Sequence, residues 1–290
     1  MSRHQKKEQI MSKVWFITGA GSGIGAATAR AALKVGDRVV ATGRNLDKVR
    51  KALIDVAGDN LALVQLDVTN EAKAHIAVAR ALEAFGRIDV LINNAGYSVL
   101  GNFEEISPAD FQSQLQTNLF GVVNVMRAVL PVMRQQRAGR IINISSVAGV
   151  IGLKHCSAYA AAKFAVEGLT FSVAHEVELF GIKIVVVSPG FFRTDLLDSG
   201  NVRYAESTIG DYAEEGSAEA MYSAYHGQQT GNPAALGEVL VKLGTMDNPP
   251  KQFMAGADAI AAVKPVLEAR LAEIDAYKVL SRESAGSFHV

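Results

Sequence analysis

Short β-branched runs alternate with longer amphipathic stretches along most of this chain, and that alternation constrains its fold most strongly. We expect strands at residues 14–18, 38–42, 61–66, 88–92, 140–144, 183–187 and 251–254. Helices are expected at residues 24–35, 45–57, 69–85, 108–137, 157–180 and 261–280. Apolar strands separated by helices of this length form a parallel sheet that is covered on both faces. With right-handed crossovers, the pattern predicts an α/β fold built on a doubly wound parallel sheet.

The strand–helix units follow one another without a linker-like change in composition. We therefore expect a single domain over residues 11–290, a length that can bury one large core. Residues 1–10 are polar and basic, and we expect them to be a disordered N-terminal extension. The alternation breaks after Pro189-Gly190, and residues 191–250 are rich in Gly, Asp, Asn and Tyr. A segment this long between core elements is usually functional, so we expect a substrate lid there.

Composition excludes several classes of protein. Lys and Arg number 29 and Asp and Glu also number 29, so charge gives no reason to expect nucleic acid or an anionic membrane as partner. There is no apolar stretch of the length that a transmembrane helix needs, and the first ten residues do not form a secretory signal. The single cysteine, Cys156, rules out an intrachain disulfide and fits a cytoplasmic protein. No metal site is expected.

A glycine-rich turn follows the first predicted strand, in the segment Thr18-Gly-Ala-Gly-Ser-Gly-Ile-Gly25. Glycines let the backbone approach a pyrophosphate, whose charge then lies at the start of the following helix. The strict G-x-G-x-x-G pattern is absent, because Ile24 occupies the position of its last glycine when counting starts at Gly19. Such a turn could simply be tight, but its place between a strand and a helix favours nucleotide binding in a Rossmann fold.

The end of the second predicted strand indicates which nicotinamide dinucleotide is bound. An acidic residue about 20 positions beyond the glycines would bind the ribose 2′-hydroxyl of NAD. This strand ends Thr42-Gly-Arg-Asn45, without a carboxylate, and Arg44 can pair with a 2′-phosphate. We therefore expect NADP(H) in preference to NAD(H). The alternative is that Arg44 is a solvated loop charge.

Tyr159 and Lys163 are four residues apart, which places them on one face of a predicted helix. A phenol in water has a pKa near 10, too high for acid–base work at neutral pH. An ammonium group about 5 Å away would lower that pKa by about two units. We therefore expect Tyr159 to transfer a proton in either direction near neutral pH.

Taken together and in order, these residues closely resemble the short-chain dehydrogenase/reductase family, and in particular its carbonyl reductase or alcohol dehydrogenase-like members. The resemblance covers roughly residues 13–195. Seven pieces in register make it specific: Thr18-Gly-x-x-x-Gly-x-Gly25, Asp67-Val68, Asn93-Asn-Ala-Gly96, Asn118, Ser145-Ser146, Tyr159-x-x-x-Lys163, and Pro189-Gly190 with Thr194.

The resemblance implies four catalytic residues. Tyr159 would protonate the carbonyl oxygen as the hydride arrives, and Lys163 would lower the tyrosine pKa and bind the nicotinamide ribose. Ser146 would hydrogen-bond the substrate oxygen, and Asn118 would hold a water molecule of a proton relay. Of the two adjacent serines, the family spacing to Tyr159 selects Ser146 over Ser145.

The resemblance also implies a set of cofactor-binding residues, in which Asp67 and Val68 would contact adenine and Thr194 the carboxamide. The full set is Gly19, Gly21, Ser22, Gly23, Ile24, Gly25, Arg44, Asp67, Val68, Asn94, Ala95, Gly96, Tyr159, Lys163, Pro189, Gly190 and Thr194. For the substrate, we expect contacts from His155, Phe191 and Phe192, although a loop histidine and lid aromatics also serve ordinary packing. An aromatic lid would suit apolar or aryl ketones.

We therefore expect an NADP(H)-dependent carbonyl reductase or alcohol dehydrogenase that acts on a small-molecule ketone or secondary alcohol. The alternatives are a fatty-acid or steroid dehydrogenase of narrow specificity, a non-catalytic NADP-binding sensor, and a halide-releasing lyase of the same fold. The lyase is disfavoured by the intact glycine turn and Lys163, and the sensor by the presence of both Tyr159 and Lys163. By analogy with the family we expect a homodimer or homotetramer, with residues 108–137 and 157–180 as the candidate interface.

Overall fold

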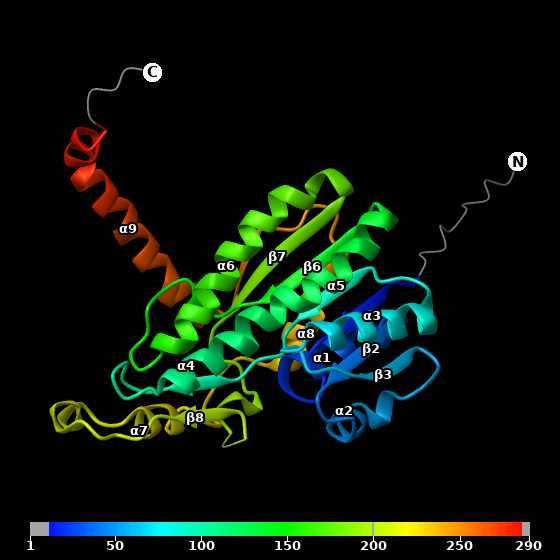
Figure 1. Cartoon of the computed structure of the whole chain (residues 1–290), viewed down its shortest axis with the longest axis horizontal. Helices are drawn as coiled ribbons and strands as arrows, with labels where there is room; N and C mark the ends of the chain where they lie inside the picture. The colour runs from blue at the N-terminus through cyan, green and yellow to red at the C-terminus, as the bar shows by residue number, and fades with distance from the viewer. Residues whose placement is uncertain (1–11, 199, 286–290) are drawn as a thin grey trace, which may run out of the picture.

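The computed structural model describes residues 12–198 and 200–285, so the predicted extension at residues 1–10 lies outside the described residues. Its centre is a parallel sheet of seven strands in the order β3-β2-β1-β4-β6-β7-β9 (Figure 1). These strands are β1 (Val14–Ile17), β2 (Arg38–Gly43), β3 (Leu61–Gln65), β4 (Val90–Asn93), β6 (Gly139–Ile144), β7 (Ile182–Pro189) and β9 (Gln252–Ala255). The order reverses between β1 and β4, which makes this the doubly wound Rossmann fold that the sequence predicts.

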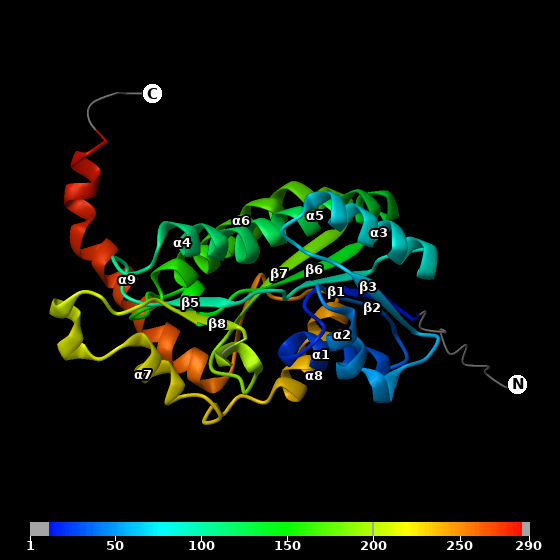
Figure 2. The ribbon, with the colours of Figure 1, turned by 60° about the horizontal axis from the view of Figure 1, so that its bottom comes forward.

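Helices cover both faces of the sheet, as Figures 1 and 2 show. One face carries α3 (Glu71–Phe85), α4 (Pro108–Leu115), α5 (Gly121–Gln136) and α6 (Ser157–Val177). The other carries α1 (Gly23–Lys34), α2 (Leu46–Ala52) and α8 (Pro233–Thr245). This three-layer arrangement confirms the predicted fold class.

The core consists of one apolar cluster on each face of the sheet. Side chains along a strand alternate between the faces, so β1 contributes Val14 and Phe16 to one cluster and Trp15 and Ile17 to the other. The first cluster packs against α3, α5 and α6, and the second against α1 and α8. Both faces of the strands are therefore buried, which explains why the strand segments are apolar throughout rather than alternating.

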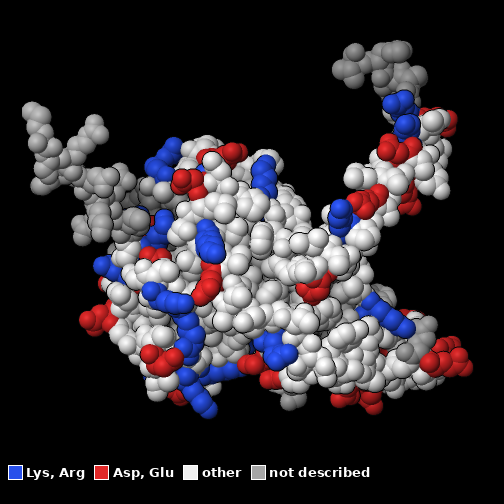
Figure 3. All heavy atoms as spheres, turned by 180° about the vertical axis from the view of Figure 1, so that it is seen from behind, with Lys and Arg blue, Asp and Glu red and all other residues white. Residues whose placement is uncertain are grey.

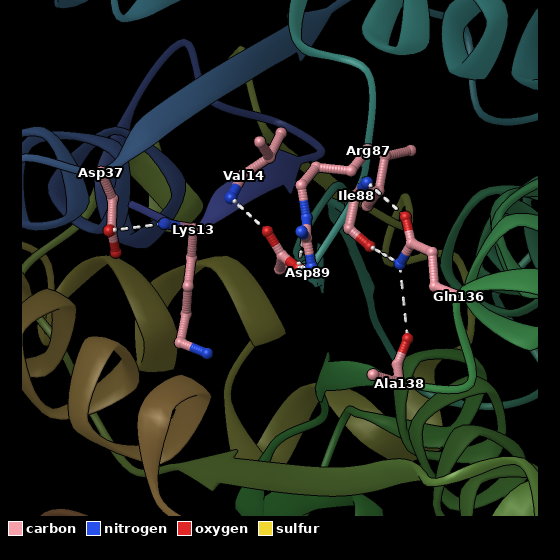
Figure 4. Close-up of polar contacts among 8 residues, drawn as sticks. All are labelled: Lys13, Val14, Asp37, Arg87, Ile88, Asp89, Gln136 and Ala138. Carbon is pink, nitrogen blue, oxygen red and sulfur yellow. Dashed lines mark hydrogen bonds and ion pairs between the residues drawn. The ribbon is translucent and has the colours of Figure 1, made fainter. Parts of the chain in front are cut away.

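Polar side chains hold the amino-terminal edge of the sheet together (Figure 4). The Asp37 carboxylate accepts hydrogen bonds from the Lys13 backbone N–H at 2.9 Å and from the Trp15 indole at 2.8 Å. The Asp89 carboxylate accepts from the Val14 backbone N–H at 2.8 Å and pairs with Arg87. Because Asp37 is committed to this edge, opposite the strand ends that carry the glycine turn, it is not a ribose-binding carboxylate.

The segment at residues 191–250, predicted as a lid, divides into two parts. Its second part forms α8, which packs so closely on α1 that a Cβ on Gly237 would lie 2.6 Å from the Ala27 carbonyl oxygen. Leu236 and Leu240 of α8 are buried in the core. We therefore use the term lid for residues 191–232 alone, and α8 belongs to the Rossmann body.

The lid contains β8 (Val202–Tyr204) and α7 (Ala218–Ser223). β8 pairs in parallel with β5 (Ser98–Leu100), a short strand that follows β4, and the two form a small second sheet. Neither strand was predicted from the sequence, since three residues are too few to show a periodic pattern.

The chain ends with α9 (Ala257–Glu283), which starts against the body and then extends away from it (Figures 1 and 2). Ala259 and Val263 in its first turns are buried against the body. Its later apolar side chains, such as Leu271 and Ile274, are exposed. On the face in Figure 3, acidic and basic side chains are interspersed over the body and along this helix. Among the helices described here, none has the length and apolar character required to cross a bilayer.

Candidate active site

The glycine turn after β1 brings backbone segments into very close contact. Gly19 and Gly23 have φ angles of +66° and +51°, in the left-handed region that favours glycine. A Cβ on Gly25, inside the first turn of α1, would lie 2.4 Å from the Gly19 carbonyl oxygen. α1 therefore starts directly against this turn at the carboxyl edge of the sheet, and a helix start of this kind is suited to bind phosphate groups.

Thr18 and Asn94 connect the glycine turn to the end of β4. The Thr18 hydroxyl accepts hydrogen bonds from the backbone N–H groups of Asn94 at 2.9 Å and Ala95 at 3.0 Å. In return, the Asn94 side chain donates to the carbonyl oxygens of Thr18 at 3.1 Å and Gly19 at 3.2 Å. The Thr18 hydroxyl, which the sequence pattern did not single out, therefore positions two of the predicted cofactor residues.

One cleft along the carboxyl edge of the sheet contains nearly all of the predicted cofactor residues. Its predicted members are Gly19, Gly21, Ser22, Gly23, Ile24, Arg44, Asp67, Val68, Asn94, Ala95, Gly96, Tyr159, Lys163, Pro189, Gly190 and Thr194. Gly25 is the exception, because it is buried beneath the turn and serves close packing. The residues that the sequence analysis did not single out include Lys48, Thr69, Thr117, Asn201 and Arg203.

These residues fit a dinucleotide, because added side-chain atoms at several glycines would meet the walls of the cleft. A Cβ on Gly21 would lie 3.3 Å from the Lys48 side chain, and one on Gly96 would lie 3.2 Å from the Asn118 carboxamide oxygen. Because Gly21 and Gly96 also line the cleft, an extended anionic cofactor could approach the backbone closely there.

Two cations line the cleft beyond the end of β2. Arg44 follows the strand, and its carbonyl oxygen accepts a hydrogen bond from the Gln65 side chain at 3.0 Å. Lys48 lies in the first turn of α2, whose start is capped by the Asn45 side chain. Asp67 lines the same region; burial acts to raise its pKa, but hydrogen bonds from Thr69 and the Arg44 charge outweigh burial and lower it.

Ser146, Tyr159 and Lys163 meet at the inner end of this cleft. The hydroxyls of Ser146 and Tyr159 are hydrogen-bonded to each other, and Ser146 Oγ also accepts from the Ala148 backbone N–H at 3.2 Å. The Lys163 ammonium lies 5.6 Å from the centre of the Tyr159 ring and donates to the Ile144 carbonyl oxygen at 2.8 Å. One turn of α6 thus carries a phenol that faces Ser146 and an ammonium that is held at the end of β6.

Burial dominates the titration of both groups on α6. It raises the pKa of Tyr159 to about 12, opposed by the hydrogen bond with Ser146. It also lowers the pKa of Lys163 to about 8, opposed by the negative charge of Glu167. The net shift of the phenol pKa is therefore opposite in sign to the one expected from the spacing of Tyr159 and Lys163, because desolvation of the phenolate is its largest cause. At neutral pH the phenol keeps its proton.

Asn118 sits where the long helix predicted at residues 108–137 changes its winding. That stretch is α4 followed by a π-helical turn at Gln116–Phe120 and then α5, and such turns often occur at functional sites. The buried Asn118 carboxamide accepts from the Tyr97 backbone N–H at 3.2 Å and donates to the Tyr97 carbonyl oxygen at 3.0 Å. The π turn thereby places a polar side chain, which lines the cleft together with Lys163.

Glu167 is a buried residue of the site that the sequence analysis missed. It lies one turn beyond Lys163 on α6, and its carboxylate accepts hydrogen bonds from Ser188 Oγ at 2.7 Å and Gln252 Nε2 at 3.0 Å. Burial raises its pKa, opposed by these hydrogen bonds, another from Ser145, and the charge of Lys163. Its spacing of four from Lys163 was the available signal.

A second, mostly apolar cavity adjoins Ser146 and Tyr159. Its other walls come from β5, the loop before α6 and the lid: Ser98, Leu100, Val147, Ala148, Leu153, Cys156, Gly190, Phe191, Phe192, Thr194, Leu196, Leu197, Tyr222 and Gln229. The predicted substrate residues Phe191 and Phe192 both line it. The Phe191 ring stacks on Tyr225, with ring centres 5.3 Å apart, so lid aromatics also pack against each other.

His155 does not line this cavity, in contrast to our expectation, whereas its neighbour Cys156 does. The His155 backbone has a φ of +59°, and its carbonyl oxygen accepts from the Gly101 N–H at 2.9 Å. Its side chain acts electrostatically on Glu105, whose pKa is lowered mainly by backbone hydrogen bonding to Ile209. Because the backbone is left-handed at His155, the side chain that lines the cavity here is that of Cys156.

Hydrogen bonds to residues that are far away in the sequence hold the lid in place at two points. The Asp258 carboxylate, at the start of α9, accepts a hydrogen bond from the Phe191 backbone N–H at 2.6 Å. On the other side, the Tyr222 hydroxyl donates to the Lys154 carbonyl oxygen at 2.9 Å and contacts Cys156 Sγ at 2.9 Å. The cavity wall is therefore held by residues far apart in the sequence.

The model of the short chain dehydrogenase family matches residues 13–204 of this chain. The chain belongs to this family. It is 38% identical, over 95% of its length and the whole of the other protein, to "Oxidoreductase BOA17" of Botryotinia fuckeliana. It is 37% identical to a 3-ketodihydrosphingosine reductase of Bacteroides thetaiotaomicron, over 85% of this chain and 89% of that protein. A short-chain dehydrogenase structure from Streptomyces avermitilis superimposes with a TM-score of 0.86 at 34% identity, covering 96% of this chain and all of that one.

This short-chain dehydrogenase is thus an oxidoreductase of a family that binds nicotinamide cofactors. Solved relatives carry either dinucleotide. A protein from Burkholderia phymatum, with a TM-score of 0.78 at 26% identity over 87% of this chain and 92% of that one, is in complex with NAD. The protein ElxO, with a TM-score of 0.69 at 31% identity over 84% of this chain and 97% of that one, has NADP bound. The preference of this chain therefore has to be argued from its own residues.

Proposed function

We propose that this short-chain dehydrogenase is an NADP(H)-dependent carbonyl reductase that converts ketones to secondary alcohols. The observation that carries the proposal is the position of the Ser146–Tyr159 pair, which lines both the cofactor cleft and the apolar cavity. A carbonyl group at this junction would meet two hydroxyls on one side and the cofactor on the other. When bound, NADPH would supply the hydride that reduces the carbonyl group.

The protein residues act on the carbonyl oxygen. Ser146 Oγ, oriented by the Ala148 N–H, hydrogen-bonds that oxygen and stabilises the charge that develops on it. Tyr159 donates its proton to the same oxygen, and its raised pKa of about 12 keeps that proton in place at neutral pH until the transfer. The positive charge of Lys163 stabilises the phenolate that remains, and a proton from solvent then restores the phenol. We assign Asn118 to this proton return, since it lines the cleft beside Lys163.

The preference for NADP(H) follows from charge at the end of β2. Arg44 and Lys48 line the cleft there, and the strand end itself lacks a carboxylate. Two cations would pair with a 2′-phosphate, and a free 2′-hydroxyl offers no such charge–charge interaction.

The substrate cavity supports a carbonyl compound with a largely apolar body. Leucine, valine, alanine and phenylalanine make up half of its sixteen lining residues, which suits apolar or aryl ketones. A steroid or long-chain substrate is the narrower alternative, and relatives include a protein named 3-alpha-(or 20-beta)-hydroxysteroid dehydrogenase from Mycobacterium tuberculosis, at 38% identity over 71% of this chain and 79% of that one.

A homodimer or homotetramer is also part of the proposal. Phe164 and Phe171 on α6 are large apolar side chains that remain exposed, and they lie on one of the two helices assigned to the interface. Sedimentation equilibrium measures the mass directly, and a monomer at micromolar concentration would contradict this part.

The experiment that tests the function is the oxidation of NADPH, with NADH in parallel, across aliphatic ketones, aryl ketones and keto esters. We expect turnover of several ketones and a preference for NADPH. Tight binding of NADPH without turnover of any carbonyl would contradict a broad reductase and favour a sensor or a narrow substrate range.

A further inference from the structure

One polar side chain of the lid lines the substrate cavity without a hydrogen-bond partner for its buried oxygen. Gln229 is 6% exposed and belongs to the cavity wall. Within the described part of the chain, its Oε1 atom has no donor. Burying an unpaired amide oxygen is unfavourable, and native proteins leave few such groups unexplained.

The other polar side chains of the lid that line the cavity, Tyr222 and Thr194, each make at least one hydrogen bond. The Tyr222 hydroxyl is engaged with the Lys154 carbonyl oxygen and Cys156. The Thr194 hydroxyl accepts from the Leu196 backbone N–H at 3.3 Å. Among the described lid residues that line the cavity, Gln229 is therefore the one with a buried side-chain oxygen that a donor group of a ligand could pair.

The backbone around Gln229 is tied to the start of the lid, so the residue is held in place rather than carried on a free loop. Arg193 Nε donates to the Gln229 carbonyl oxygen at 3.3 Å. Two residues later, Gly231 donates to the Phe191 carbonyl oxygen at 3.0 Å and accepts from the Arg193 N–H at 2.9 Å. A Cβ on Gly231 would lie 2.7 Å from the Phe192 ring, so this junction admits little displacement.

We propose that Gln229 binds a second polar group of the substrate, a hydrogen-bond donor such as a hydroxyl or an amine. The substrate would then be a hydroxy or amino ketone with an otherwise apolar body, whose carbonyl group lies at Ser146 and Tyr159. This inference rests on the proposed reductase function. A site that hydrogen-bonds a substrate hydroxyl discriminates against the analogue that lacks it, because its own polar group is then buried unpaired.

The test uses matched ketones and a neighbouring residue as control. Methyl ketones with a terminal hydroxyl at increasing distance from the carbonyl are each compared with the alkyl ketone and the methyl ether of the same length. Gln229→Met keeps the length of the side chain and removes its amide. The adjacent Gln228 is exposed, so Gln228→Met makes the same chemical change outside the cavity.

For the wild type, we expect kcat/KM for the hydroxy ketone of the right length to exceed that of its alkyl analogue by about tenfold or more. Gln229→Met should bring this ratio close to one while NADPH affinity stays the same, and Gln228→Met should preserve the ratio. No hydroxyl preference at any length, or a preference that survives Gln229→Met, would overturn the inference. A preference for the methyl ether would overturn the assignment of a donor.

Binding calorimetry distinguishes a failure of the Gln229 inference from a failure of the proposed reductase function. If the wild type reduces none of these ketones, the reductase function fails, but the same ketones can still be titrated into the protein in the presence of NADPH. Tighter binding of a hydroxy ketone that is lost in Gln229→Met would retain the inference, and equal binding of all three analogues would reject it.

Discussion

The cofactor cleft and the substrate cavity meet at Tyr159 but are built in different ways. The cleft is formed by turns at the carboxyl ends of consecutive strands, and its key atoms are backbone groups held by the sheet and by Thr18. The cavity is closed by lid segments that are fixed through contacts with Lys154, Cys156 and Asp258, far away in the sequence. Cofactor binding should therefore tolerate little backbone change, whereas substrate selection should respond gradually to side-chain changes.

The largest change in NADPH affinity is expected from Gly25→Ala. The added methyl group would meet the Gly19 carbonyl oxygen, which belongs to the sheet-anchored turn and cannot move freely. Overpacking of this kind costs about 1–3 kcal/mol, so we expect the dissociation constant of NADPH to rise about 10- to 100-fold. Fluorescence titration of NADPH measures this change.

Gly168→Ala is the matched control, since Gly168 is also helical but has open space where a Cβ would lie. It should leave NADPH binding unchanged. Equal affinities for the wild type and Gly25→Ala would show that the turn is not as rigid as the close contact implies.

The next effect concerns charge at the end of β2. Arg44→Asp replaces a cation of the cleft by a carboxylate that can bind a ribose 2′-hydroxyl. Loss of a charge-assisted hydrogen bond is worth about 1.5–3 kcal/mol, so the NADPH/NADH ratio of kcat/KM should fall about 10- to 100-fold. Arg38→Asp makes the same change at the opposite end of the strand and should leave the ratio intact. An unchanged ratio in Arg44→Asp would refute the cofactor argument.

The junction of the two regions should respond to pH through Lys163. Burial lowers its pKa to about 8, so the ammonium is present below that pH and is lost as the pH rises through it. We expect kcat/KM for ketone reduction to be level below about pH 8 and to fall by about tenfold per pH unit above it. Lys163→Arg, which keeps the charge, should remove this break from the profile. A wild-type profile that stays level to pH 10 would contradict the assigned role of the ammonium.

The smallest effect is expected in the lid. Tyr222→Phe removes the hydroxyl that contacts the Lys154 carbonyl oxygen and Cys156, a change worth about 1 kcal/mol. KM for ketones should rise a few-fold, with little change in kcat or NADPH affinity, in steady-state kinetics. Tyr277→Phe, on the exposed part of α9, is the control. A loss of NADPH affinity in Tyr222→Phe would remove the separation between the two regions.

The cofactor region could be predicted from the sequence because its determinants are local. The glycine turn, the pair Tyr159 and Lys163, and the strand–helix alternation are all short patterns whose spacing reflects helix or strand geometry. Those patterns predicted the sheet and the helices on both of its faces. Arg44 was likewise visible as a residue at a strand end.

Apart from Phe191 and Phe192, the residues of the substrate region could not be predicted, because its contacts join segments that are distant in the chain. Gln229 becomes a cavity residue through backbone pairing of Gly231 with Phe191. Such pairing leaves no periodic pattern in the sequence from which it could be predicted. Cys156 rather than His155 lines the cavity, because the backbone at His155 is left-handed. The sign of the Tyr159 pKa shift also required the structure, since burial of the phenol cannot be judged from the spacing of two residues.

The central claim is that Tyr159 supplies the proton at a site where NADPH binds independently of it. Tyr159→Phe removes one hydroxyl, and the measurement is single-turnover NADPH oxidation with a good ketone substrate, alongside a titration of NADPH. We expect turnover to fall by at least about a thousandfold while the NADPH dissociation constant changes less than about threefold. A variant that oxidises NADPH at the wild-type rate would contradict the account.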